Sequence, residues 1–246
     1  MRLRALLAAA VLTTATAPAA LAAPGIAHGT DVPAGQYGFV AKLSMTKIPR
    51  PDGSTYSSYC TGSLIAPGWL LTTGHCFHDA NRNRVSGKAP YPTTVTLGLV
   101  DEGTESGIAR RVTEVVQAKE NDVALAKLDT PVTTVQPLKV RHAVPKIGEQ
   151  LTVAGWGSLT STDPKPATRM QQGTVAVAKL DPTTLGVRGA APDITTSACT
   201  YDSGAPYFTG TELVAVEATG PGCPHAGIET TSRADVLSDW ITKTTA

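Results

Sequence analysis

The sequence lacks any cluster of basic residues and carries almost no net charge. Its 21 lysines and arginines face 20 aspartates and glutamates over 246 residues. If a leader containing Arg2 and Arg4 is removed, 19 basic residues face the 20 acidic ones, a formal charge of −1. A balance of this kind argues against nucleic acid or an anionic membrane as the partner. Charge alone therefore says little about the substrate.

Beyond its first residues the sequence has no apolar stretch near the roughly 20 residues that a membrane span needs. The early apolar run, residues 5–12, follows two arginines and leads into the small-residue pattern Ala20-Leu21-Ala22. This arrangement is typical of a secretory signal peptide, which we expect to occupy residues 1–22. The mature protein would then be soluble, secreted and extracellular. An N-terminal membrane anchor is the alternative.

The sequence has only four cysteines and no CxxC pair, which disfavours a zinc site. An even number of cysteines in an exported protein favours disulfides, and four cysteines allow three pairings. Proximity favours Cys60 with Cys76 and Cys199 with Cys223. Each short loop closed in this way stabilises the fold by about 3 kcal/mol in the chain-entropy model.

The sequence also lacks the H-E-x-x-H motif of zinc hydrolases. Apart from His75, its histidines form no set with metal-ligand spacing, and we expect them to be solvated loop residues: His28, His78, His142 and His225. We therefore predict neither a metal nor a cofactor.

Long helical patterns are scarce, and short apolar runs dominate. With 23 glycines and 18 prolines, the chain alternates apolar runs of four to eight residues with turn-rich breaks. The runs are rich in Val, Thr and Leu, for example at residues 39–43, 69–73, 95–100, 151–156 and 213–218. About a dozen strands at this spacing predict an all-β sandwich or barrel.

A proline-spaced connection divides the strand-rich sequence into two halves. Pro131, Pro137 and Pro145 would each interrupt a strand ladder. We place the domain boundary here, so that residues 26–133 and 134–246 each form a compact unit of roughly 110 residues.

The pattern predicts one helix, at the C-terminus. Ser232 and Asp235 form an S-x-x-D start of the kind that caps a helix. Four apolar residues then form one face and predict a packing helix without chemistry: Val236, Leu237, Trp240 and Ile241.

Three short motifs carry the candidate chemistry: TTGHC around His75, NDVAL around Asp122 and YDSGAP around Ser203. A histidine, an acid and a serine are the groups that turn a weak hydroxyl into a nucleophile for acyl transfer. Each residue alone could be an ordinary turn or cap residue. The order of the three and the flanking cysteines make the set specific, and the α/β-hydrolase order with its G-x-S-x-G elbow is absent.

These motifs resemble those of the trypsin/chymotrypsin-like serine protease family, and in particular its secreted bacterial members. CTGSLIAPGWLLTTGHC is similar to the segment around that family's general base, ENDVALAKLD to its acid strand and CTYDSGAP to its nucleophile loop C-x-G-D-S-G-G-P. The start IAHGTDVPAGQYGFVAKL and the motif AGWG also match, so the resemblance covers residues 26–246. It implies two packed antiparallel β-barrels with a C-terminal α-helix and the active site between them.

The resemblance implies a secreted serine endopeptidase that works through an acyl-enzyme. His75 would be the general base, Asp122 its orienting acid and Ser203 the nucleophile. The main-chain N–H groups of Tyr201 and Ser203 would form the oxyanion hole. It also implies a polypeptide substrate, protein inhibitors as further partners and a monomer, with no nucleic acid and no membrane.

The resemblance further implies a zymogen. Cleavage before Ile26 would remove residues 23–25 as a short propeptide and release an α-ammonium group that pairs with Asp202. A buried carboxylate without a partner is costly, so this pairing would be an effective switch. No Arg or Lys precedes Ile26, so trypsin-like self-activation is not implied.

Four positions match the family's primary substrate pocket. Ser197 corresponds to its base, Gly220 and Gly227 to small wall residues, and Glu229 lies near its rear wall. An open, uncharged pocket favours an apolar or aromatic side chain before the scissile bond. Glu229 leaves open the alternative of a basic side chain.

Several residues depart from the family pattern. Tyr201 stands where the family has the glycine of the oxyanion hole, and its Cβ penalises backbone angles that glycine tolerates. Milder departures near the motifs are Thr61 for Gly, Gly74 for Ala, Ala205 for Gly and Ala218 for Ser. They leave an alternative function, a weakened or inactive homologue that binds a peptide or protein.

Overall fold

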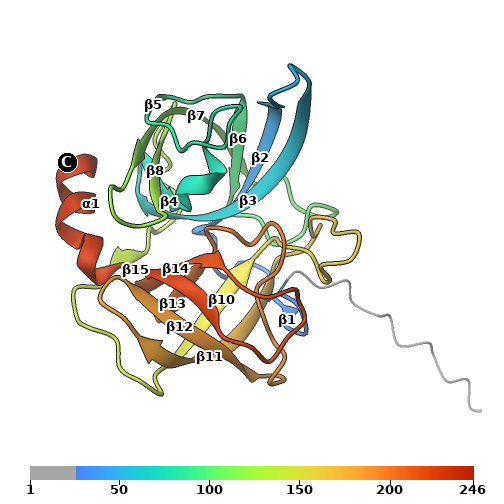
Figure 1. Cartoon of the computed structure of the whole chain (residues 1–246), viewed down its shortest axis with the longest axis vertical. Coiled ribbons are helices and arrows are strands. Elements are labelled where there is room, and N and C mark those ends of the chain that lie inside the picture. Colours follow the sequence, from blue (N-terminus) through green and yellow to red (C-terminus); the bar gives the residue numbers. More distant parts are fainter. Residues whose placement is uncertain (1–25) are drawn as a thin grey trace, which may run out of the picture.

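The computed structural model describes residues 26–246, so the predicted signal peptide (1–22) and propeptide (23–25) lie outside the described residues. The chain forms two antiparallel β-barrels that pack side by side, followed by a short C-terminal helix (Figure 1). The predicted fold class is confirmed.

The first barrel is a seven-stranded sheet in the order β5-β7-β6-β2-β3-β4-β8, and pairing of β7 with β8 closes it. It is built from one continuous part of the chain. Its strands are β2 (Val40–Pro49), β3 (Thr55–Ala66), β4 (Trp69–Thr72), β5 (Gly87–Lys88), β6 (Thr93–Leu97), β7 (Ile108–Gln117) and β8 (Ala124–Leu128).

The second barrel is an eight-stranded sheet in which β11 and β12 pair to close the ring, and β9 joins β14 in parallel. Its first strand, β1, comes from the N-terminal segment and pairs with β11. The start of the described chain therefore belongs to the second barrel, although the strands of the first barrel come next in the sequence. Its strands are β1 (Thr30–Asp31), β9 (Lys139–Val140), β10 (Gln150–Gly155), β11 (Gln171–Leu180), β12 (Thr184–Ala191), β13 (Pro206–Thr209), β14 (Glu212–Thr219) and β15 (Glu229–Arg233).

Each barrel has its own apolar core, and a third apolar cluster joins the two. Strand β11 alternates buried and less buried residues, which places Val175 and Val177 in the core of the second barrel. The joining cluster combines Val40 and Leu125 of the first barrel with Trp156 and Phe208 of the second. Burial of this interface fixes how the loops of the two barrels face each other.

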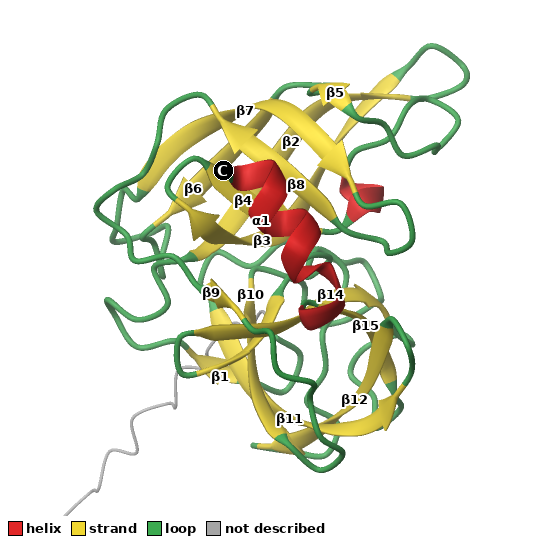
Figure 2. Ribbon diagram, turned by 90° about the vertical axis from the view of Figure 1, so that its left-hand side faces the viewer, coloured by secondary structure: helices red, strands yellow, loops and turns green. Residues whose placement is uncertain are grey.

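The C-terminal helix is present but begins differently from the prediction. Ser232 is still part of β15, and Arg233 holds the Asp235 carboxylate at 2.6 Å, so neither residue caps the helix. A 3-10 turn, η2 (Asp235–Leu237), precedes α1 (Ser238–Thr245) and leaves Val236 44% exposed. Leu237 and Ile241 are buried in the joining cluster, and α1 lies across the first barrel (Figure 2).

Both predicted disulfides are confirmed. Cys60 on β3 is bonded to Cys76, and Cys199 to Cys223. The first bond ties a short 3-10 turn, η1 (Gly74–Cys76), to the barrel wall. Within residues 26–246, no helix is long and apolar enough to cross a membrane.

Candidate active site

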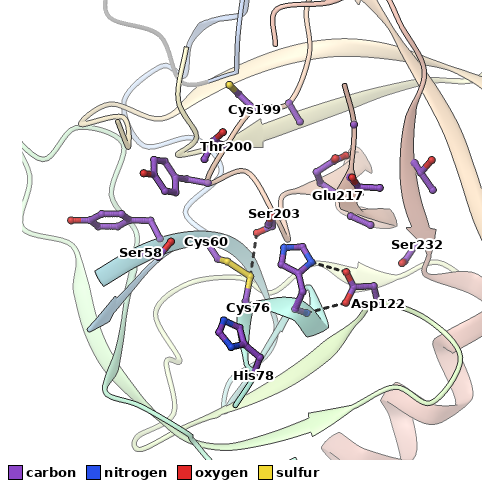
Figure 3. Close-up of a pocket in the computed structure, with 18 of the residues that line it drawn as sticks. Ser58, Cys60, Cys76, His78, Asp122, Cys199, Thr200, Ser203, Glu217 and Ser232 are labelled. Carbon is purple, nitrogen blue, oxygen red and sulfur yellow. Dashed lines mark hydrogen bonds and ion pairs between the residues drawn. A yellow bond between two sulfur atoms is a disulfide. The ribbon is translucent and has the colours of Figure 1, made fainter. Parts of the chain in front are cut away.

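His75 and Asp122 form a directly bonded pair at the edge of the first barrel. His75 lies in η1, and Asp122 lies in the loop between β7 and β8. The imidazole Nδ1 is 2.6 Å from Oδ2 of Asp122, and the His75 main-chain N–H donates to Oδ1 at 2.9 Å (Figure 3). A carboxylate can only accept, so Nδ1 carries the hydrogen and Nε2 is the ring nitrogen that can take up a proton.

The protonation state of Asp122 suits this arrangement. Burial raises the pKa of its carboxyl group, but the hydrogen bonds and charge of His75 and the nearby Arg84 outweigh burial and hold the pKa below its ordinary value. Asp122 is therefore an anion that can stabilise a charged imidazole ring.

Ser203 lies in the loop before β13 and lines the same cleft as His75 and Asp122, a cavity of about 790 Å³. Its carbonyl oxygen accepts a hydrogen bond from the N–H of Thr61 on β3 at 2.9 Å. Gly204 has a φ of +89°, and a Cβ there would collide with Thr61 and Thr72. The loop that carries Ser203 in the second barrel is thus hydrogen-bonded to the wall of the first, beside the His75–Asp122 pair.

Tyr201 adopts the backbone conformation expected of the glycine that it replaces. Its φ is +80°, a region that costs a residue with a side chain on the order of 1–3 kcal/mol. Three contacts hold it there: its ring meets Tyr59 edge-on at 5.7 Å, its hydroxyl donates to the Pro164 carbonyl at 3.3 Å, and its carbonyl accepts from the Thr61 hydroxyl at 3.1 Å. Tyr201 and Thr61 both depart from the family pattern, and the hydroxyl group of Thr61 helps to hold Tyr201 in this conformation.

Two main-chain N–H groups of this loop are left for a ligand. Asp202 N–H donates to the Cys199 carbonyl at 2.9 Å and Gly204 N–H to the Glu217 carbonyl at 3.0 Å. In the described part of the chain, no hydrogen bond uses the N–H of Tyr201 or of Ser203. Amides of this kind on either side of a nucleophile can bind a developing oxyanion.

Asp202 is fully buried beneath the loop. Its carboxylate accepts the N–H groups of Gly157 at 2.8 Å and Cys199 at 3.0 Å, and a Cβ on Gly155 or Gly157 would collide with it. Burial raises the pKa of Asp202 well above its ordinary value, and the charge of Glu229 adds to this. The ion pairs of residues 26–246 include none to Asp202.

Ile26, the other member of the predicted activation pair, is also buried in the second barrel. Its side chain shares the core cluster with Ala205, three residues beyond Asp202. Ala27 and Ser197 exchange main-chain hydrogen bonds of 2.9 and 3.1 Å, which ties the N-terminal segment to this barrel. No ion pair joins Ile26 to Asp202 in the uncut chain, where the Ile26 nitrogen is a peptide amide.

The predicted pocket residues are only partly brought to the cleft. Gly220 lines it, whereas Ser197, Gly227 and Glu229 do not. The ring of His225 lies between them: a Cβ on Gly220 would be 3.5 Å from its Nε2, and one on Gly227 3.4 Å from its Nδ1.

The prediction that all four other histidines are solvated was wrong for two of them. The His225 side chain is only 10% exposed, and the main-chain N–H of His225 donates to the Ser197 hydroxyl oxygen at 3.3 Å. His78 is buried beneath Tyr91, with which its ring packs edge-on. In both cases residues that are distant in the sequence bury the ring, and the spacing of residues in the sequence does not predict such burial. Within residues 26–246, no three His, Cys, Asp or Glu residues are grouped to hold a metal ion.

Glu217 is a further residue of the cleft, and none of the sequence motifs includes it. It lies on β14, is only 4% exposed and lines the cleft. The available signal was a glutamate within the otherwise apolar run LVAVEA, since a charged residue in a core strand needs a partner.

Arg84 is a second addition. Its guanidinium lies 3.6 Å from Oδ1 of Asp122 and donates to the Asn121 carbonyl at 2.5 Å. A Cβ on Gly74 would lie 2.8 Å from that nitrogen, so the Gly74 departure makes room for the arginine. The positive charge of Arg84 thus stabilises the Asp122 carboxylate. Ala218, which stands where the family has a serine, offers no hydroxyl group for this purpose.

Replacing Arg84 by methionine should move the acid limb of the kcat/KM profile to higher pH by about a few tenths of a unit. The acid limb reports protonation of the general base, and removing the Arg84 charge beside the Asp122–His75 pair makes a protonated, positive imidazole less unfavourable. Steady-state kinetics between pH 4 and 8 would measure the shift, with Arg84→Lys retaining the wild-type limb. Arg82→Met, in the same cleft, is the matched control; an equal shift in that variant would contradict the assignment.

Comparison with known proteins gives a consistent family. The model of the family described as Trypsin matches residues 26–241. Trypsin-1 and Trypsin-2 of Salmo salar are 25% and 26% identical over 205 and 206 residues; each alignment covers 76% of this chain, and 81% and 85% of those proteins. The structure of neuropsin, a serine protease of mouse brain, superimposes with a TM-score of 0.72 at 18% identity over 90% of this chain and 100% of that one. These relatives are animal proteins, so they do not support the narrower resemblance to bacterial members.

Proposed function

Because the chain belongs to the trypsin family and is thereby a serine-type endopeptidase, we propose that His75, Asp122 and Ser203 are its catalytic triad. The observation that carries this proposal is the Asp122 carboxylate, which binds both the Nδ1 and the main-chain N–H of His75 in the cleft that Ser203 also lines. The acid thereby fixes both the position and the tautomer of the imidazole ring.

In the proposed mechanism, the Ser203 hydroxyl attacks the scissile carbonyl while Nε2 of His75 accepts its proton. The charged ring is stabilised by Asp122, and the carbonyl oxygen, now an oxyanion, binds the N–H groups of Tyr201 and Ser203. His75 then gives the proton to the leaving amine, which leaves an acyl-enzyme. Water attacks this ester by the same steps in reverse and frees Ser203.

Covalent labelling tests the proposal directly. Protein processed to begin at Ile26 should react with a fluorophosphonate at a single residue, and peptide mass spectrometry should locate the adduct on Ser203. The His75→Ala variant should not react, because no imidazole then takes up the serine proton. Absence of an adduct from correctly processed, folded protein would instead favour the non-catalytic alternative.

Export and partners complete the proposal. The segment 1–22 has the composition of a signal peptide, and its removal would place the enzyme outside the cell. The family implies a polypeptide substrate; a monomeric state and protein inhibitors remain proposals. The apolar preference expected from the sequence rests on Ser197 and Gly227, which do not line the cleft, and on Gly220, which does.

One observation favours a weakened enzyme, namely the positive φ of Tyr201. The conformation depends on contacts of the tyrosine ring and hydroxyl, because the backbone alone disfavours it. Catalysis would therefore depend on side-chain contacts that a glycine would not need.

Two substitutions of Tyr201 distinguish the effect of its backbone strain from the effect of its ring contacts. Tyr201→Gly should keep ester turnover at or above the wild-type level, because glycine adopts this φ without penalty. Tyr201→Ala keeps the Cβ but loses the ring contacts, so turnover should fall by about tenfold. Burst kinetics with a small activated ester would measure both variants. Equal rates in the two would show that the ring does not support the oxyanion loop.

A further inference from the structure

Three buried polar side chains meet on neighbouring strands of the second barrel. Tyr207 on β13, Glu217 on β14 and Glu229 on β15 are 0%, 4% and 2% exposed. The Tyr207 hydroxyl oxygen lies 2.7 Å from an oxygen of each glutamate. The phenol therefore bridges two carboxyl groups in the interior of the barrel.

Counting hydrogens constrains the charge of this cluster. Two oxygen–oxygen contacts of 2.7 Å need two hydrogens, and the phenol supplies only one. While both contacts persist, one of the two carboxyl groups must be protonated and the pair carries at most one negative charge. Burial, together with the charge of Glu229, raises the pKa of Glu217 well above its ordinary value, which agrees with this count.

No fixed cation neutralises the cluster from any packed element. Asp202, from the nucleophile loop, adds a third carboxyl group, and the Ala198 N–H donates to Glu229 at 2.6 Å. His225, from the loop before β15, is the one titratable base nearby, with Nε2 at 3.5 Å from Glu229. Among the ion pairs of residues 26–246, no lysine or arginine reaches either glutamate.

Glu217 connects this cluster to the substrate cleft. It lines the cavity that contains Ser203 and is drawn there with Asp122 and Cys199 (Figure 3). Ala198 and Gly220, which flank the predicted primary pocket, line the same cavity. The imidazole of His225, whose Nε2 is buried without a hydrogen bond, already lies between the pocket walls. A substrate side chain that reaches Glu217 would therefore enter from the open cleft, beside this ring.

We propose that Glu217, supported from behind by Tyr207 and Glu229, is the specificity-determining residue of the pocket and pairs with the side chain of lysine or arginine before the scissile bond. The inference rests on the proposed endopeptidase function and replaces the apolar preference expected from Ser197. A substrate ammonium group would supply the cation that the cluster lacks, with Glu217 ionised, the Tyr207 hydroxyl donating to it, and the remaining carboxyl hydrogen on Glu229. An apolar side chain would leave that carboxylate desolvated and unpaired.

The proposal predicts a pH dependence specific to basic substrates. A carboxyl group with a raised pKa is neutral at low pH and gains its charge only as the pH rises through that raised value. The kcat/KM ratio between a lysine substrate and its neutral counterpart should therefore increase with pH. Groups common to both substrates, including the triad, cancel in this ratio.

The test uses matched fluorogenic peptides with lysine, arginine, norleucine or phenylalanine before the cut and protein processed to begin at Ile26. Lysine should exceed norleucine, its near-isostere without the charge, by about a hundredfold in kcat/KM. Glu217→Gln should remove most of that factor. Glu212→Gln, at the exposed end of the same strand, is the matched control and should retain the wild-type ratio.

Failure of this inference is distinguishable from failure of the proposed function. If Ser203 is labelled by a fluorophosphonate but wild-type protein prefers norleucine or phenylalanine, the inference on Glu217 is overturned and the endopeptidase stands. If Ser203 is not labelled and no peptide is cut, the proposed function itself fails. If Glu217→Gln does not fold, the wild-type protein still tests the inference. Its kcat/KM ratio of lysine to norleucine substrate should be high and should rise with pH, and a low ratio would overturn the inference.

Discussion

Replacing Ser203 by alanine should lower kcat for peptide substrates by about a million-fold. In the proposed mechanism its hydroxyl forms the acyl-enzyme, whereas its hydrogen bond to Thr61 uses the main chain. The substitution therefore removes the reacting atom and leaves the fastening of the loop to the first barrel unchanged. Hydrolysis of a fluorogenic peptide, followed over days at high enzyme concentration, would measure the loss.

Ser58→Ala provides the matched control, since Ser58 lies on β3 and lines the same cleft. It should retain turnover within about twofold, because no step of the mechanism uses it. Asp122→Asn should lower kcat by about ten-thousandfold, a loss between those of the other two variants, because an amide no longer imposes the productive tautomer on His75. A residual rate in Ser203→Ala above a thousandth of wild type would show that another group is the nucleophile.

The parts of the site that sequence could predict are those fixed by short motifs. His75 and Ser203 each lie within a few residues of a cysteine, so short motifs predicted both disulfides, which the structure confirms, and the candidate catalytic residues, which stay a prediction. The strands could be predicted as well, because the alternation of buried and exposed side chains in segments such as β11 depends only on the local sequence.

What sequence missed depends on contacts between distant segments. Thr61 looked like an isolated departure, yet its hydroxyl supports the Tyr201 carbonyl from 140 positions away. Glu217, Tyr207 and Glu229 converge only because β13, β14 and β15 are neighbours in the sheet. The start of the terminal helix was wrong for a similar reason, since pairing of Ser232 with Val216 keeps that residue in β15.

Cleavage before Ile26 should raise peptide hydrolysis by about a thousandfold over the uncut chain. The physical reason is the buried Asp202 carboxylate, which two main-chain N–H groups bind but no cation neutralises within the described residues. Ile26 is already buried in the same barrel, so its new α-ammonium needs to travel only within that barrel. Pairing would order the loop that carries the Tyr201 and Ser203 amides. Protein cut by an inserted protease site and the uncut chain would be compared on one substrate.

Asp202→Asn should have opposite effects on the two forms. In the uncut chain the raised pKa of Asp202 means that its contribution to stability is complete in acid and is lost as the pH rises through that raised value. The asparagine variant should therefore unfold at higher denaturant concentration than wild type at neutral pH. In the cut chain it lacks the anion that binds the α-ammonium, so activity should fall about a thousandfold. Acetylation of Ile26 should reproduce that loss without touching the loop, and an acetylated enzyme with full activity would contradict the activation pair.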